Sequence, residues 1–474
     1  MIPLDLTQQP VELPVNMFLH PTADNGKPAM VNFPGYLAMD DVTTGKVQDC
    51  CAWGVYSYWL IADTLYHVVG STANTLVSKK ADFIGSATKN ATMITDGTYV
   101  CAVCGDAYVY WYKISDSTNN KVDVSGITGG SATTGLTLQD GYFIACGPYG
   151  NNFCISDLND PTTWNALNFE DEEYKPDVCV NVYSFQRKLF VFGTDTYVVY
   201  ENTGNTDFPF ERIPGAVFDV GIGGKIAIYT TYGAEKTAIE CNGELYFMAS
   251  DNTIKRIRSF EHETVSTAEV NKYLKDFRTS TCWAWTALVD GMWFYAISNG
   301  TYTLALNTAT GQWIRLASGT DGASNYPATC SLLWNQLSNS VYKQKTFMGL
   351  GSGGEYVLLG ENATTNFYSE DGAAQYREIQ TQVIEANRER MYMGQLEVWA
   401  KKYVGSTTVN PTLSVSWSDD GGTTFSTART LYLGLSGGTG DQLRTFMLGS
   451  SYNRIFKFSS SNIYELQLYG GYLS

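Results

Sequence analysis

The residue types that most often carry out chemistry in proteins are sparse in this sequence. The chain of 474 residues holds three histidines, His20, His67 and His262, which lie far apart and at no spacing typical of a metal site or a catalytic triad. Cys101 and Cys104 form a CxxC pair, but no second pair lies at zinc-finger spacing and no helical pattern follows it, as one does in redox pairs. Within a strand the two thiols would face opposite sides. We therefore predict structural or surface roles for these side chains.

Residues 418–425 read Ser-Asp-Asp-Gly-Gly-Thr-Thr-Phe and match the Asp-box pattern S-x-D-x-G-x-T-[W/F], which is common in sialidases and other sugar-active propellers. The Asp and Gly of such a box form a hairpin turn and the aromatic residue packs beneath it, so the motif is structural. A sialidase would also need spaced arginines for the carboxylate and a pair of a tyrosine and an acid. The sequence has one box and no evident arginine set, which favours a structural turn.

Two further patterns are weak. Acidic residues at 171–173, and Asp157 with Asp160, lie in segments rich in Asn and Pro, where carboxylates usually belong to solvated turns. Gly221–Gly224 lacks the strand before it and the helix after it that a nucleotide-binding glycine motif requires. The sequence thus predicts no enzyme, no catalytic residue, no cofactor and no metal.

The composition is typical of an all-β protein. Charged residues make up only 16% of the chain and aromatic residues 14%, and 45 glycines favour tight turns. A chain of this length is too long for one simple core. We expect two or more domains, or one large repeat architecture with an appendage.

The net charge of −16 argues against a basic surface that grips nucleic acid. DNA carries about one negative charge per 1.7 Å of axis, so an acidic wall would let DNA slide past without holding it. The first 21 residues lack the basic start and apolar core of a signal peptide, and no run approaches the length of a membrane span. We therefore expect a cytoplasmic chain without a membrane anchor. Its ten cysteines should be reduced and behave mostly as small apolar core residues.

A turn followed by aromatic and β-branched residues recurs along the chain, at residues 97–100, 141–144, 186–190, 243–246 and 291–294. The first residues of these segments are separated by 44, 45, 57 and 48 positions, and repeats of about 40 to 50 residues with several strands each are typical of propeller blades. Asn and Asp turns that lead to Trp164 and Trp313 resemble the ends of outer blade strands. The pattern predicts six or seven blades, and an irregular pair of β-sandwiches is the alternative.

These patterns divide the chain into three parts. Residues 1–45 are rich in proline and predict an extended N-terminal arm, and residues 46–375 predict the β-propeller. A helical insertion is expected near 266–277, where Ser266 and Glu269 have the form of a capping box with Ser266 as N-cap. Residues 376–474 predict a β-sandwich, in which alternation places Leu396, Val398 and Ala400 on one face.

The sequence resembles the tail nozzle, or hub and packaged-DNA stabilisation, proteins of short-tailed bacteriophages. The similarity runs in order along most of the chain. It covers residues 13–17 and 33–35 of the arm, the central segment at 155–167, residues 193–200 and 218–221, the helical segment at 266–270, and residues 376–398 with Asn387 and Arg388. Each motif is short, and their common order makes the resemblance specific.

The resemblance implies a virion structural protein of the tail, assembled in the host cytoplasm. It implies a homo-hexameric ring below the portal and head–tail adaptor that extends the DNA channel, retains the packaged genome, and lets double-stranded DNA pass at ejection. The implied partners are the adaptor or portal ring, tailspikes or tail fibres, and a needle or gate protein. The Asp box and the many cysteines depart from the family pattern, and a glycan-binding or sialidase-like propeller for receptor recognition remains the alternative function.

Overall fold

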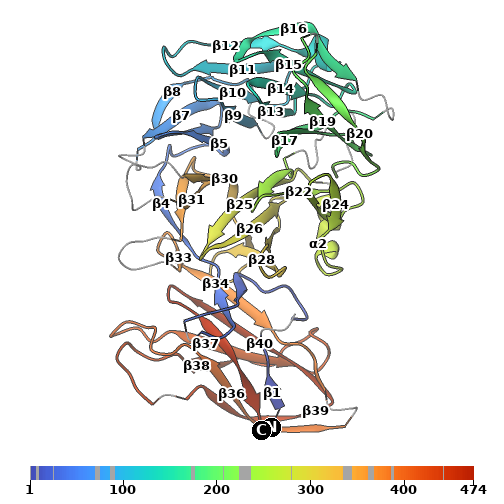
Figure 1. The fold of residues 1–474 in the computed structure, drawn as a ribbon. Helices are drawn as coiled ribbons and strands as arrows, with labels where there is room; N and C mark the ends of the chain where they lie inside the picture. Colours follow the sequence, from blue (N-terminus) through green and yellow to red (C-terminus); the bar gives the residue numbers. More distant parts are fainter. Residues whose placement is uncertain are drawn as a thin grey trace.

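The computed structural model describes residues 2–474 apart from 7–9, 25, 70–74, 86–90, 172–176, 207, 224–235, 279, 335–343, 361–367, 386–388 and 441. In this part of the chain, strands form a ring of β-sheets and a second β-domain below it (Figure 1). The expectation of an all-β fold with a β-propeller is confirmed, whereas the described part of residues 1–45 does not form a separate extended arm, because its strands pair with strands of both domains.

Seven four-stranded antiparallel units, the blades, make up the ring in the described residues. Blade 1 holds β5 (Val47–Trp53), β6 (Tyr56–Ile61), β7 (Thr64–Val69) and β8 (Val77–Lys80), and blade 2 holds β9 (Thr92–Thr95), β10 (Tyr99–Val103), β11 (Tyr108–Lys113) and β12 (Asn119–Asp123). Blade 3 holds β13 (Gly135–Gln139), β14 (Tyr142–Cys146), β15 (Asn152–Asp157) and β16 (Asp160–Asp171), and blade 4 holds β17 (Asn181–Phe185), β18 (Lys188–Phe192), β19 (Tyr197–Asn202) and β20 (Phe210–Phe218). Blade 5 holds β21 (Ile239–Cys241), β22 (Glu244–Met248), β23 (Ile254–Arg258) and β24 (Glu261–Thr264). Blade 6 holds β25 (Trp283–Val289), β26 (Met292–Ser298), β27 (Thr303–Asn307) and β28 (Trp313–Ser318), extended by β29 (Ser324–Asn325).

Blade 7 closes the ring with strands from both ends of the chain. Its inner strands are β30 (Ala328–Trp334), β31 (Lys345–Leu350) and β32 (Tyr356–Leu359), and its outer strand is β4 (Tyr36–Asp40) from the N-terminal segment. A separate apolar cluster lies between each pair of neighbouring blades, including one that joins blade 7 to blade 1 through Val47, Trp59 and Trp334. The ring is therefore closed by packing and by the strand that β4 adds.

The repeated turn motif of the sequence lies at the first hairpin of the blades. Gly97, Gly141, Gly243 and Gly291 have positive φ angles between 76° and 89° there, as tight hairpin turns require. Blade 4 has Gln186 and Arg187 instead, with φ angles of 50° and 58°. No glycine therefore marks the turn of this blade, and the longer interval to the next turn arises from the chain between β20 and β21 (Ile239–Cys241).

Replacing Gln186 and Arg187 by Asn and Gly should stabilise the chain by about 1 kcal/mol, because side chains with a Cβ atom resist positive φ. The ion pair lost with Arg187, at 3.1 Å from Asp140, lies on an arginine that is 84% exposed and contributes little. Thermal unfolding measures the effect as a higher Tm. A lower Tm would show that the native turn carries no strain.

The second domain is a β-sandwich. One sheet runs β2 (Met17–His20), β3 (Ala29–Asn32), β41 (Gln467–Leu473), β36 (Met391–Ala400) and β39 (Arg444–Ser451), with β1 (Ile2–Leu4) also paired to β41. The facing sheet runs β34 (Ala373–Gln380), β40 (Asn453–Asn462), β37 (Thr412–Ser418) and β38 (Arg429–Tyr432), with β35 (Ile384–Glu385) beside β40 and the short β33 (Ser369–Glu370) linking β34 to β4. Leu396, Val398 and Ala400 face the core between the sheets, as their alternation predicts.

The N-terminal segment is part of both domains. Strands β1, β2 and β3 belong to the sandwich, and both chain ends lie together at its far end, where Ile2 pairs with Leu473 (Figure 1). Along the β2–β3 hairpin, Met17 and Met30 enter the sandwich core while Phe18 and Val31 pack against blades 6 and 7. The hairpin thus lies between the two domains.

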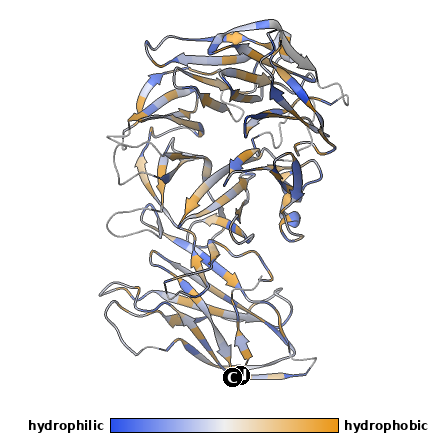
Figure 2. Ribbon diagram, in the orientation of Figure 1, coloured by the Kyte–Doolittle hydropathy of each residue, from blue (hydrophilic) through white to orange (hydrophobic). Residues whose placement is uncertain are grey.

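The predicted helix is present on the propeller rim between blades 5 and 6, as α2 (Val270–Phe277). Hydrophobic residues run along the blade strands (Figure 2), and Val270, Leu274 and Phe277 anchor the helix in the cluster between the two blades. The prediction of a capping box was wrong. The Ser266 hydroxyl accepts a bond from the Ile254 amide, and the Thr267 hydroxyl accepts the amide of Val270 instead. A second helix, α1 (Ser125–Thr128), is a single turn.

Candidate functional site

Residues Pro14–Asn16, which we call the clasp, join the propeller to the sandwich. The Val15 amide donates to the Glu378 carbonyl of β34 at 2.8 Å and its carbonyl accepts from the Glu378 amide at 3.0 Å. On the other side, the Arg315 amide of β28 donates to the Pro14 carbonyl at 2.8 Å, and the Asn16 amide donates to the Arg315 carbonyl at 2.9 Å. The clasp therefore hydrogen-bonds one strand from each domain.

The side chain of Asn16 completes this junction. It is fully buried, with φ of 50°, a conformation that Asn tolerates better than most residues. Its Nδ2 donates to the carbonyls of Ala317 in blade 6, at 2.7 Å, and Tyr376 in the sandwich, at 2.8 Å. Its Oδ1 accepts the Ala317 amide at 3.0 Å. One amide group thus satisfies backbone polar groups of both domains.

A second contact of the N-terminal segment lies at residues 33–35. Phe33 is fully buried, and its ring meets those of Phe294 and Tyr326 edge to face, with centroids 5.3 Å and 6.2 Å apart. Gly35 passes so close to the backbone of Ser369 that a Cβ atom would lie 1.9 Å from the Ser369 carbonyl oxygen. Residues 13–17 and 33–35, the two arm segments that resemble the phage family, therefore both lie at contacts between the N-terminal segment and other parts of the fold.

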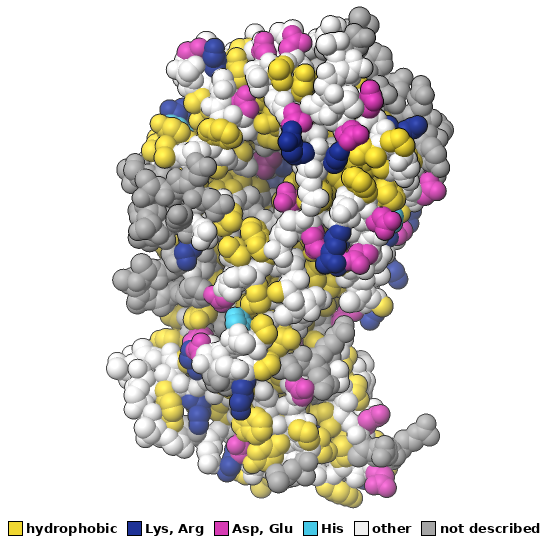
Figure 3. All heavy atoms as spheres, viewed as in Figure 1, with side chains coloured by type: hydrophobic (Ala, Val, Ile, Leu, Met, Phe, Trp, Pro, Cys, Tyr) yellow, Lys and Arg dark blue, Asp and Glu magenta, His cyan; other side chains and the backbone are white. Residues whose placement is uncertain are grey.

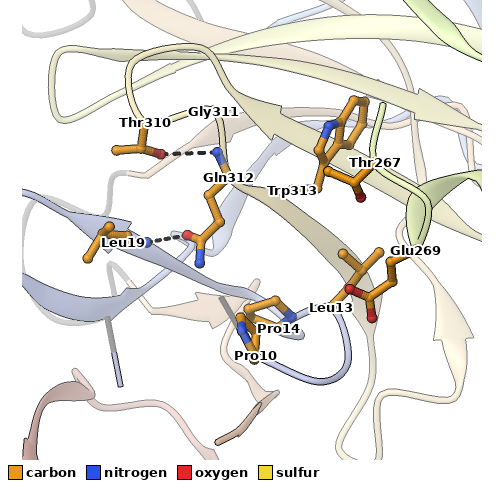
Figure 4. Close-up of a pocket in the computed structure, with 10 residues that line it drawn as sticks. All are labelled: Pro10, Leu13, Pro14, Leu19, Thr267, Glu269, Thr310, Gly311, Gln312 and Trp313. Carbon is orange, nitrogen blue, oxygen red and sulfur yellow. Dashed lines mark hydrogen bonds between the residues drawn. The ribbon is translucent and has the colours of Figure 1, made fainter. Parts of the chain in front are cut away.

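A cavity of about 200 Å³ lies where the arm meets the propeller rim (Figure 4). Leu13 and Pro14 of the arm line one side, and Glu269 and Trp313 line the other. Glu269 points toward Leu13, and its Oε1 is buried without a hydrogen-bond partner. Burial, together with the nearby Glu12 carboxylate, raises the pKa of Glu269 to about 7, although Lys272 and the Leu13 amide oppose this shift.

Glu269→Gln should remove a pH-dependent loss in the free energy of unfolding that arises at the contact between the arm and the propeller rim. The folded chain keeps a proton on Glu269 up to about pH 7, and the unfolded chain loses it near pH 4.5. The free energy of unfolding therefore falls as pH rises between these values and stays lowered above pH 7. We expect the variant to exceed the native chain in stability by about 1 to 2 kcal/mol at pH 8, a figure reduced for partial exposure, and to match it near pH 4.

Urea unfolding at the two pH values measures this difference. Glu261→Gln, on an exposed residue of β24, is the matched control and should show no such dependence on pH. An equal gain for Glu269→Gln at pH 4 and pH 8 would contradict the account.

The Asp box is a loop after β37. Asp420 accepts bonds from the Ser418 hydroxyl at 2.6 Å and from the Thr424 hydroxyl at 2.6 Å, and these bonds lower its pKa to about 2. The neighbouring Asp419 binds the buried Arg454 through two bonds of 2.6 Å and 2.7 Å. Both carboxylates are therefore engaged within the fold.

The other candidate residues of the sequence lie apart from one another. His20 is on β2, His67 is buried in blade 1 and stacked on Tyr56, and His262 is in blade 5 within 3.1 Å of the Tyr197 hydroxyl. Burial lowers the pKa of His67 to about 4. Cys101 and Cys104 belong to different clusters between blades.

Asp157 and Asp160 flank the β15–β16 turn of blade 3, where Asp160 accepts the Thr162 hydroxyl and amide. The acidic residues at 172 and 173, the glycine at 224, and residues 387 and 388 lie outside the described residues.

The sandwich carries an exposed apolar surface that sequence analysis did not single out. Tyr392 and Trp399 of β36 are 79% and 48% exposed, and Phe446 and Met447 of β39 are 54% and 87% exposed. We call these four residues the outer face. β39 is the last strand of its sheet, and the guanidinium of Arg429 donates to the carbonyls of Phe446 and Met447 there. Large exposed apolar residues in one region are typical of contact surfaces.

Charges on the molecular surface are mixed. On the face shown in Figure 3, Lys and Arg side chains are interspersed with Asp and Glu and form no single basic patch. Among the described residues, no helix has the length and apolar character needed to cross a membrane.

Comparison with known proteins gives one family match. The family model described as "Bacteriophage P22 Gp10, beta-propeller" matches residues 9–340. The match begins in the arm and includes the clasp. No curated protein sequence matches the chain. Among solved structures, the crystal structure of the computationally designed Ika8 protein is similar at 11% identity and a TM-score of 0.39, covering 68% of this chain and 98% of that one.

Proposed function

The chain belongs to the bacteriophage P22 Gp10 β-propeller family, and from this premise we propose that it is the subunit of a hexameric tail nozzle. Six copies would form a ring below the portal and adaptor, continue the DNA channel, retain the genome, and carry tailspikes or fibres. A needle or gate protein would close the lumen until ejection. Family membership is the observation that carries this proposal.

The clasp supports a role as a building block. It ties blade 6 to β34, while the sheet of blade 7 continues through β4 and β33 into the sandwich. These hydrogen bonds hold the two domains of a subunit together at two places. That property suits a particle that holds DNA under pressure.

The size of the propeller's own centre supports a lumen built by several subunits. The cavity among the inner strands measures about 340 Å³ and is lined by side chains of several blades. A B-DNA duplex is wider than its major groove, which alone measures about 12 Å across. A cavity of this volume therefore cannot admit a duplex. The net charge of −16 suits a wall that DNA passes without binding.

We assign the contact between neighbouring subunits to the outer face. Its aromatic residues lie on β36 and β39, the last two strands of their sheet, where their side chains are exposed to solvent. Burial against a second copy in a ring would remove this apolar surface from water.

The proposal can be tested by mixing the purified chain with portal–adaptor complexes and counting bound copies by native mass spectrometry. We expect six copies for the native chain and a loss of complex for Trp399→Ser with Phe446→Ser. Trp53→Ser is the matched control, because Trp53 is 56% exposed but lies on blade 1, and it should still assemble. A monomer that ignores the portal–adaptor complex and binds or cleaves bacterial polysaccharide would overturn the proposal in favour of a glycan-binding propeller.

A further inference from the structure

The first and last blades meet along β5 and β30, at the seam where the ring closes. Their shared cluster contains Val47 from blade 1 and Cys330 from blade 7, with Cys50 packed against it. Within one chain, this seam has to hold together segments that are far apart in sequence. A bond across it would stabilise the whole ring.

Three potential metal ligands gather at this seam. One carboxylate oxygen of Asp49 and the sulfur atoms of Cys50 and Cys330 all lie within 4.8 Å of one another, and no other group of this kind occurs in the described part of the chain. Ligand atoms around a tetrahedral Zn²⁺ ion are separated by about 3.5 to 3.8 Å, given the usual Zn–S and Zn–O bond lengths. Side-chain rotations alone could bring the three atoms to that separation.

The group opens onto the central cavity. Asp49, Cys50 and Cys330 all line this space of about 340 Å³. An ion can therefore reach the sulfur atoms from the cavity, and the cavity leaves room for a water molecule as a fourth ligand.

The surroundings orient the carboxylate and balance the charge. The amides of Cys50 and Met93 donate to the two oxygens of Asp49 at 3.0 Å and 2.8 Å, which holds the carboxylate in place. The ammonium of Lys236 lies 3.3 Å from Asp49 and also donates to the carbonyls of Gln48 and Ala91. A divalent ion with two thiolates and one carboxylate has a net charge of −1, which the Lys236 ammonium neutralises.

We propose that Asp49, Cys50 and Cys330 bind one thiophilic divalent cation, Zn²⁺ by preference, and thereby cross-link blade 1 to blade 7. Each thiol releases its proton to solvent as its sulfur binds the ion, and no oxidation is involved. Thiolate ligands favour Zn²⁺ over Mg²⁺ or Ca²⁺, which prefer oxygen. The site does not depend on the proposed role in a phage tail.

Co²⁺ is the probe for this site, since it replaces Zn²⁺ in tetrahedral sites and absorbs visibly when thiolates bind it. The reduced native chain should bind one Co²⁺, show thiolate-to-metal charge-transfer absorption, and lose that signal when Zn²⁺ is added. Added Zn²⁺ should raise the Tm, and a chelator should reverse the rise.

Cys50→Ala and Cys330→Ala should each remove the absorption and the rise in Tm. Cys241→Ala is the matched control, because Cys241 is a buried thiol like Cys330 but lies in blade 5, and it should keep both. If an alanine variant fails to fold, Co²⁺ absorption and the Zn²⁺-dependent Tm of the native chain still test the proposal. A chain that retains no metal, that binds Co²⁺ without charge-transfer absorption, or that carries a Cys50–Cys330 disulfide when isolated under reducing conditions would overturn the proposal.

Discussion

Asn16→Ala should lower the free energy of unfolding by about 3 to 5 kcal/mol, since two buried hydrogen bonds and one partly buried one are lost and backbone groups of two domains are left unpaired. Asn16 bonds Ala317 in blade 6 and Tyr376 in the sandwich, at distances between 2.7 Å and 3.0 Å. Alanine can replace none of these bonds, and it tolerates the positive φ of this position less well than Asn. Calorimetry should show the single unfolding transition separating into two as the domains lose their coupling.

Asn242→Ala is the matched control for this prediction. Asn242 also has a positive φ, of 56°, but it is exposed in the first hairpin of blade 5. Its replacement should cost about 1 kcal/mol or less, the cost of the backbone conformation alone. Equal losses for the two variants would show that the clasp bonds contribute nothing to stability.

Asp419→Ala should cost about 3 kcal/mol or more, because it leaves a buried guanidinium without its counter-ion. The side chain of Arg454 is only 2% exposed and binds Asp419 through two nitrogens. The third nitrogen donates to the Leu448 carbonyl at 2.7 Å, so the arginine cannot turn toward solvent without breaking that bond as well. Urea unfolding followed by tryptophan fluorescence measures the loss.

Glu201→Ala removes a comparable but more exposed ion pair, since its partner Lys188 is 29% exposed. Its cost should stay within about 1 kcal/mol. If Asp419→Ala is as mild as Glu201→Ala, the carboxylates of the Asp box are free for another role, and the reading of this loop as structural fails.

The sequence predicts the elements of this fold better than their assembly. Glycines with positive φ mark the blade hairpins, and alternation at 396–400 marks an amphipathic strand, because both signals are local. The cap of α2 was misassigned because the Ser266 hydroxyl accepts the amide of Ile254 in β23, a contact that the local pattern does not reveal, and α2 begins after Glu269 without a capping bond from the Glu269 side chain.

The junction between domains could not be predicted in the same way. Asn16 bonds residues 301 and 360 positions away, and β1 pairs with the last strand of the chain. A local sequence pattern does not indicate pairings between residues so far apart in the chain. From the sequence, the arm is therefore recognisable only as a segment rich in proline. Cys50 and Cys330 were interpreted as apolar core residues for the same reason, since only the closed ring brings their sulfur atoms together.

An electron-microscopy reconstruction of the chain bound to portal–adaptor complexes, calculated without imposed symmetry, tests the proposed hexameric nozzle. We expect six copies around a lumen wide enough for duplex DNA, with the outer face of each sandwich against its neighbour. Single copies without a shared axis, or a closed assembly whose lumen excludes a duplex, would contradict it.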